Sequence, residues 1–151
     1  MESLRRDLLA EGFTVSLCGL PSGRGSCSIA SVEGFWQELA EVGITSDDLV
    51  VAIGAAEALS VASFACSFWC GGTQLALIPT DLSSALVAGT TPLPLELPGV
   101  HRLVMQEGHA RFLFCDLGLM DLDDSSESVL YARALMVAIA ISDSDKAFGR
   151  L

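Results

Sequence analysis

Residues 48–72 read DLVVAIGAAEALSVASFACSFWCGG, and this stretch decides the fold class of the chain. The run from Leu49 to Ile53 is continuously apolar, as in a strand buried in the middle of a parallel sheet. After Gly54, small Ala, Ser and Cys side chains continue to Cys70, which is the length of a helix that packs closely on a sheet. α/β proteins commonly bind phosphate at such a turn, yet this turn holds a single glycine.

Helix and strand patterns alternate along the rest of the chain. Upstream, residues 3–12 and 28–43 have helical spacing and end at glycines, whereas residues 13–19 predict a strand. Downstream, residues 73–79 predict a strand, and residues 80–89 predict a short helix with Thr80 as its N-cap.

The last third of the chain is less regular. Residues 90–99 are rich in proline and predict a loop or an extended arm. Residues 101–118 predict two strands about Gly108, and residues 123–151 predict a capped helix followed by a short one. The whole pattern predicts one domain over residues 1–151, an α/β, Rossmann-like fold with a mostly parallel sheet and helices on both faces.

The charge balance excludes several classes of partner. The chain has 151 residues, with 8 Lys and Arg against 19 Asp and Glu, a formal net charge of -11. Phosphate backbones and anionic lipid headgroups would be repelled, so we expect neither nucleic acid nor membrane as a partner. No apolar run reaches the roughly 20 residues of a membrane-spanning helix, and no signal peptide is evident, so we expect a cytoplasmic protein.

Five cysteines lie scattered through apolar segments, an odd number that favours reduced thiols over a disulfide framework. Cys66 and Cys70 are four residues apart and would share one face of a helix. No nearby histidine or second cysteine pair completes a metal site. We interpret both as small core residues.

The order of these segments resembles the dinucleotide-binding half of the 3-dehydroquinate synthase family. The resemblance covers residues 19–86, with loop LPSGRGSCS, turn GAAEALS and strand end IPTDL, and continues through LPGVHRLV and FLFCDLGLMDL. Members of that family bind NAD and one divalent metal, usually zinc. They convert a phosphorylated keto sugar acid into 3-dehydroquinate in the shikimate pathway.

Several family motif positions carry different residues here. The loop glutamate and lysine of the family correspond to Arg24 and Cys27. Two turn glycines correspond to Ala55 and Ala56, whose Cβ atoms would crowd a pyrophosphate, and Glu57 adds a negative charge there.

Differences continue beyond the turn. The later glycine and aspartate correspond to Leu59 and Ser60, and the second threonine of the strand end to Asp81, an anion that we expect to face the cofactor position. Gly54 and Thr80 are the cofactor-contact positions that survive.

The family's metal set has no counterpart either. Only His101 and His109 are present, and residues 129–141 contain no acidic side chain, so a His2Glu zinc set cannot be assembled. We therefore expect no metal-binding residues, no NAD or zinc cofactor, and no C-terminal metal-binding helical domain. The family's first strand is also missing, which predicts an open sheet edge.

The resulting hypothesis is a catalytically inactive synthase-like domain with a binding, oligomerisation or regulatory role, without catalytic residues of its own. A homodimer, or pairing with a genuine synthase, follows by analogy with the family. The alternative is a functional synthase fragment that needs another chain for activity. Arg24, His101 and Arg102 are candidate contacts for a small anionic ligand, although each also fits an ordinary surface position.

An acidic cluster formed by Asp121, Asp123, Asp124 and Glu127 lacks the glycine turn and ligand spacing of a calcium loop. Acidic side chains are favourable at a helix N-terminus. We interpret the cluster as the solvated start of a helix.

Overall fold

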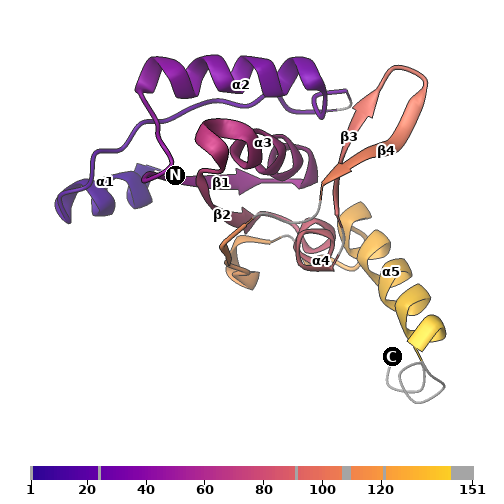
Figure 1. The fold of residues 1–151 in the computed structure, drawn as a ribbon. Helices are drawn as coiled ribbons and strands as arrows, with labels where there is room; N and C mark the ends of the chain where they lie inside the picture. Colours follow the sequence, from indigo (N-terminus) through magenta and orange to yellow (C-terminus); the bar gives the residue numbers. More distant parts are fainter. Residues whose placement is uncertain (1, 24, 91, 107–109, 121, 144–151) are drawn as a thin grey trace.

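Two parallel strands and the helix between them form the centre of the structure. The computed structural model describes residues 2–23, 25–90, 92–106, 110–120 and 122–143. Figure 1 shows the order of the elements along the chain. They are α1 (Glu2–Ala10), α2 (Ile29–Val42), β1 (Leu49–Gly54), α3 (Ala56–Phe68), the 3-10 turn η1 (Trp69–Gly71), β2 (Gln74–Pro79), α4 (Leu82–Thr90), β3 (Leu93–Leu97), β4 (Val100–Gln106), β5 (Phe112–Leu113), the 3-10 turn η2 (Leu117–Leu119) and α5 (Glu127–Asp143).

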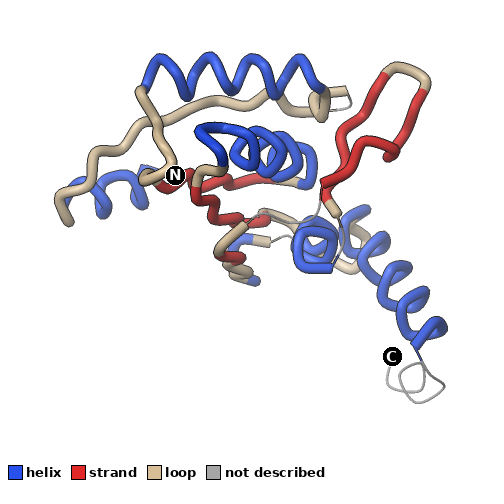
Figure 2. Tube along the Cα trace, viewed as in Figure 1, coloured by secondary structure: helices blue, strands red, loops and turns tan. Residues whose placement is uncertain are grey.

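The described strands form two sheets (Figure 2). The first is parallel, in the order β1-β2-β5, and Leu49 lies opposite Gln74 while Gly54 lies opposite Pro79. The second is an antiparallel hairpin of β3 and β4. This arrangement confirms a Rossmann-like α/β fold with a parallel sheet and helices.

The core forms where α3 packs against β1 and β2, with α2 packed against α3. Leu39 of α2, Leu59 of α3 and Leu75 of β2 are fully buried. Small side chains allow this close packing, since α3 buries residues on most of its circumference. They include Ser60, Ala62, Ser63, Ala65 and Cys66.

Both ends of α2 carry capping residues, of which the sequence predicts Gly43. Ser28 is the N-cap, and its Oγ accepts a hydrogen bond from the Ser31 amide at 3.3 Å. At the other end Gly43 has φ 80°, and its N–H donates to the carbonyls of Leu39 and Ala40. A left-handed residue at this position ends the helix and is least costly for glycine.

Two strand predictions around β1 are wrong. Residues 13–19 are not part of a strand. Their apolar side chains Phe13 and Leu17, which favour the strand prediction, are exposed. β1 lies at an edge of its sheet and not in the middle. Both errors have one cause. A central strand needs a paired strand on each side, but among the described residues β1 pairs with β2 only, and residues 13–19 do not pair with β1.

The proline-rich segment, predicted as a loop or extended arm, is instead regular structure. Leu93–Leu97 forms β3, whose strand partner among the described residues is β4. Proline lacks the N–H that a central strand needs on both sides, but Pro94 is tolerated because no described strand pairs with the other edge of β3, where Cys27 makes the contacts. β4 and β5 match the two predicted strands, whereas the turn about Gly108 and the second C-terminal helix lie outside the described residues.

The structure also corrects two smaller predictions. The N-cap of α4 is Asp81 and not Thr80, since the Asp81 carboxylate accepts a hydrogen bond from the Ser84 amide at 2.9 Å. Cys66 is buried as expected, but Cys70 is exposed, because η1 turns the chain away there at a φ of 50°.

No helix in the described part of the chain is long and apolar enough to cross a bilayer.

Candidate functional site

The turn from β1 into α3 is closed by packing. A Cβ atom on Gly54 would lie 3.0 Å from the Cβ of Ala58, a contact so tight that Ala58 would have to move by a few tenths of an ångström. The carbonyl of Gly54 accepts a hydrogen bond from the Thr80 amide at 3.1 Å, which joins the carboxyl ends of β1 and β2. The structure therefore brings Gly54 and Thr80 together, and Gly54 has a structural reason to remain glycine.

The N-terminus of α3 offers little for an anion beyond its backbone. Ala55 is the N-cap residue and makes no side-chain capping bond, and Glu57 occupies the first turn. A carboxylate there offsets the partial positive charge of the helix end, as a bound phosphate would. The methyl groups of Ala55 and Ala56 and this charge make the turn a poor cradle for pyrophosphate.

Cys27 is buried where the loop after residue 20 enters α2. Its thiol donates to the carbonyl of Pro94 at 3.0 Å, and its own carbonyl accepts from the Glu96 amide at 2.7 Å. Burial is the largest influence and raises the pKa of the Cys27 thiol above its ordinary value, with Glu96 and Glu57 adding to the increase. The side chain is thus a neutral packing group that joins α2 to β3.

The cysteine environments predict an order of chemical labelling. Cys70 and Cys115 are exposed, whereas Cys27 and Cys66 are buried, and burial raises the pKa of the Cys66 thiol to about 12. Because thiolates react and buried thiols do not, we expect a maleimide at neutral pH to modify Cys70 and Cys115 first. Peptide mass mapping over time checks this order, and equal rates at Cys66 and Cys70 would contradict the described packing.

Asp81 receives four hydrogen bonds at the start of α4. The hydroxyls of Ser83 and Ser128 donate to Oδ1 at 2.6 and 2.9 Å, the Ser84 amide donates to Oδ1 at 2.9 Å, and the Ser84 hydroxyl donates to Oδ2. Partial burial acts to raise the pKa of Asp81, but the hydrogen bonds from these three serines together outweigh it and hold the pKa below its usual range.

This network changes the interpretation of Asp81. The sequence predicts that this carboxylate faces a cofactor position, but both of its oxygens accept hydrogen bonds from serines of α4 and α5. Ser128 also accepts from the Ser83 amide at 3.1 Å, so the network fastens the start of α5 to the start of α4. Sequence reasoning did not find Ser128, since it lies 47 residues from Asp81 and follows no local motif.

The other candidate anion contacts are less completely described. Arg24 lies outside the described residues, as does His109. His101 and Arg102 belong to β4, but their side chains lie outside the described part of the structure. Among the described residues, no group of three or more His, Cys, Asp or Glu side chains gathers in a metal-binding arrangement.

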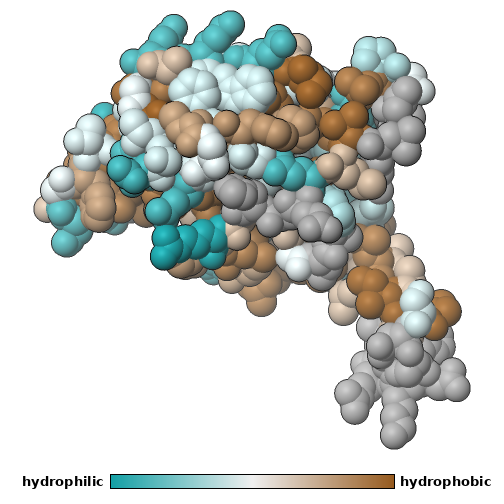
Figure 3. Space-filling model, viewed as in Figure 1, coloured by the Kyte–Doolittle hydropathy of each residue, from teal (hydrophilic) through white to brown (hydrophobic). Residues whose placement is uncertain are grey.

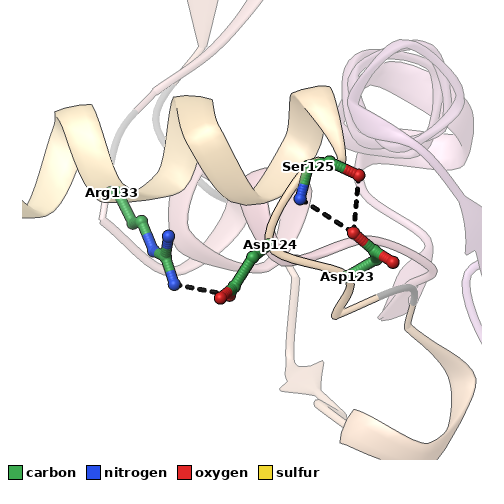
Figure 4. Close-up of polar contacts among 4 residues, drawn as sticks. All are labelled: Asp123, Asp124, Ser125 and Arg133. Atoms are coloured by element: carbon green, nitrogen blue, oxygen red, sulfur yellow. Dashed lines mark hydrogen bonds and ion pairs between the residues drawn. The ribbon is translucent and has the colours of Figure 1, made fainter.

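The acidic cluster before α5 forms local contacts (Figure 4). Asp123 accepts hydrogen bonds from the amide and hydroxyl of Ser125 at 2.8 and 2.6 Å. Asp124 pairs with Arg133, in the second turn of α5, at 2.6 Å, and both side chains are exposed. These contacts match the predicted helix start, although Asp121 lies outside the described residues.

No family model matches this chain, but curated 3-dehydroquinate synthases match it over part of their length. It is 27% identical over 126 residues to the 3-dehydroquinate synthase of Clostridium kluyveri, covering 82% of this chain and 35% of that protein. It is 33% identical over 89 residues to the same enzyme of Gloeobacter violaceus, covering 57% of this chain and 25% of that protein. The chain thus spans about a third or less of the curated relatives it matches.

Solved structures show the same fold. A 2-deoxy-scyllo-inosose synthase complexed with carbaglucose-6-phosphate, NAD+ and Co2+ superposes with a TM-score of 0.80 at 17% identity, over 92% of this chain and 39% of that one. A 2-epi-5-epi-valiolone synthase from Streptomyces hygroscopicus with NAD+ and Zn2+ bound gives a TM-score of 0.71 at 17% identity, over 78% of this chain and 33% of that one.

Proposed function

Because this chain is 3-dehydroquinate synthase-like in sequence and fold, we propose that it is a catalytically inactive relative of those synthases with a binding, oligomerisation or regulatory role. Its place would be in the cytoplasm and tied to the shikimate pathway. One observation carries the proposal. At three positions that resemble the family's cofactor motifs, Gly54, Cys27 and Asp81, the residue is committed to contacts inside the protein.

Each commitment removes something that NAD would need. The space beside Gly54, where a phosphate would approach the backbone, is occupied by the side chain of Ala58. Cys27 is a neutral buried thiol where the family has a lysine. Asp81 adds a carboxylate that is hydrogen-bonded to serines. The described residues that surround the turn therefore fit a dinucleotide poorly.

A titration with NAD by calorimetry, with and without added zinc, tests this part of the proposal. We expect no saturable heat from folded protein whose mass in solution has been measured, and a full-length 3-dehydroquinate synthase serves as the positive control. Saturable binding in the micromolar range would contradict the proposal and favour a functional fragment that another chain completes.

Inorganic phosphate titrated in parallel checks the candidate anion contacts at Arg24, Thr80, His101 and Arg102.

The surface of α5 supports the oligomerisation role. Residues 129–142 contain a single charged side chain, Arg133, which is paired with Asp124. A helix that is apolar on all sides is normally buried, yet much of α5 is exposed and projects from the body (Figures 1 and 3). Its exposed apolar residues are Leu130, Tyr131, Met136, Val137, Ile139 and Ile141.

The lack of net charge on this surface suits contact with a second copy of the chain. With a formal net charge of -11 on each copy, most approaches between two copies bring like charges together. Between residues 129 and 142 of α5 the one charged side chain, Arg133, is already paired with Asp124, so two copies can meet along this stretch while burying apolar side chains. The same face suits pairing with a genuine synthase.

We expect the chain to be a dimer by light scattering and Ile139→Lys to shift it toward monomer. Ile139 is 52% exposed, so the lysine costs the folded monomer little but places a charge in the interface. Leu9→Lys on α1 is the matched control, because Leu9 is 47% exposed, and it should leave the mass unchanged. An equal effect of the two substitutions, or a monomeric wild-type chain, would count against α5 as the interface.

A further inference from the structure

β1 has the composition of a central strand but the position of an edge strand. All six residues from Leu49 to Gly54 are apolar or glycine, a composition typical of parallel strands with neighbours on both sides. Among the described residues only β2 pairs with it. Leu49 is 50% exposed and Val51 is 37% exposed, whereas Leu75, Ala76 and Leu77 of β2 are buried.

A second extended segment, residues 13–20, also has no strand partner among the described residues. Residues 13–20 run beneath α2 in the direction of β1 in Figure 1, and the segment leads through α2 into β1. Cys18 and Leu20 pack against the core, and the segment from Gly19 to Pro21 lies along α2. Phe13 and Leu17 are 62% and 55% exposed. The segment has the place of a first strand in a β-α-β unit but forms no ladder with β1.

We propose that the free edge of β1 is a docking site for an extended apolar segment of another polypeptide, which adds a strand parallel to β1. Sheet edges present unpaired N–H and C=O groups that another strand can engage. The parallel direction continues the arrangement of β1, β2 and β5. Exposed apolar side chains of β1 and of residues 13–20 would then be covered by the apolar side chains of the incoming strand.

Charge defines the incoming segment further. Asp47 and Asp48 immediately precede β1 and are exposed, and Asp48 is fixed by hydrogen bonds from the amide and hydroxyl of Thr45 at 2.8 and 2.9 Å. A parallel strand begins at the same end as β1. The best partner therefore has a lysine or arginine followed by five or six residues rich in Val, Ile and Leu. This inference does not depend on whether NAD binds.

The geometry argues against a second copy at this edge. Two copies related by a two-fold axis would pair β1 with β1 in the antiparallel direction. Such a pair would still leave residues 13–20 without a parallel neighbour. A dimer whose β1 amides are protected from hydrogen exchange in the isolated protein would overturn the proposal in favour of this self-pairing.

A fused strand tests the docking site directly. The segment Lys-Val-Thr-Val-Ile-Val is joined to the amino end of the full chain by a flexible Gly/Ser linker, and the control fusion carries proline at alternate strand positions. We expect the first fusion to raise the thermal midpoint by several degrees relative to the control. Hydrogen exchange should slow at least tenfold at β1 amides and in residues 13–20. Equal midpoints and equal exchange in the two fusions would overturn the proposal.

A labelled peptide gives a second readout if either fusion folds poorly. The Lys-headed peptide, its Glu-headed counterpart and the proline-interrupted control are each titrated against the wild-type chain by fluorescence polarisation. The Lys-headed peptide should bind most tightly, and its advantage over the Glu-headed peptide should shrink as salt is added. Binding by none of the peptides, or protection confined to α5, would count against the β1 edge.

Discussion

Gly54→Ala is expected to lower the free energy of unfolding by about 1–3 kcal/mol, the usual cost of adding atoms to a well-packed site. The new Cβ would lie 3.0 Å from the Cβ of Ala58, so α3 would have to move away from the end of β1. Urea unfolding followed by circular dichroism measures the loss. If Gly54 were kept for a bound pyrophosphate alone, the substitution would leave the stability of the free protein unchanged.

A double-mutant cycle separates this contact from other effects of the alanine. Ala58→Gly removes the opposing methyl group but costs about 1 kcal/mol of helix propensity on its own. In the combined variant the loss should be smaller than the sum of the two single losses, because the clash is gone. Strict additivity would show that another contact fixes the glycine.

Gly34→Ala is the matched control for the same chemical change. Gly34 lies within α2, is exposed, and has no heavy atom within 4 Å of its Cβ position. Alanine there should stabilise the protein by up to about 1 kcal/mol, since glycine in a helix carries a conformational cost. The opposite signs at Gly34 and Gly54 would show that packing at the turn determines the effect.

Asp81→Ala is expected to destabilise the protein by about 2–3 kcal/mol, the scale of losing charge-assisted hydrogen bonds and a helix N-cap together. The substitution leaves the hydroxyls of Ser83, Ser84 and Ser128 without their shared acceptor. Because Ser128 belongs to α5, hydrogen exchange should accelerate at the start of α5 as well as in α4. An effect confined to α4 would mean that the two helix starts are not fastened together.

The pH dependence of stability gives an independent check on Asp81. Its folded pKa lies below the ordinary value of 3.8, so the carboxylate stabilises the folded state fully above the unfolded pKa. That contribution is lost as pH falls from about 4 through the folded pKa. Asp81→Asn should flatten the stability curve in this acidic window, and an unchanged curve would exclude Asp81 as its source.

Local patterns were sufficient to predict the centre of the fold. The apolar run of β1, the small residues of α3 and the glycine that ends α2 act within one element, and the structure forms all three elements, although β1 lies at the edge of its sheet and not in the middle. Residues 13–19 and 93–97 were assigned wrongly because strand formation depends on a partner distant in sequence. The first segment lacks such a partner among the described residues, and the second finds one in β4.

In the candidate site, too, some contacts were predictable from the sequence and others were not. Gly54 is the last residue of β1, and Thr80 directly follows β2, the parallel neighbour of β1. The order of the strands alone therefore predicts that these two residues lie close together. The partners of Cys27 and Asp81 were not predictable. Pro94 lies 67 residues from Cys27, and Ser128 lies 47 residues from Asp81, so no spacing in the sequence connects them.

The contact between Cys27 and β3 has a consequence for the order of folding. The thiol and the carbonyl of Cys27 both have their partners in Leu93–Leu97, so these two contacts at the start of α2 cannot form until β3 is in place. Closing a loop of this length carries an entropic cost before the contact stabilises anything. During synthesis on the ribosome, therefore, the start of α2 gains these contacts only after β3 has emerged.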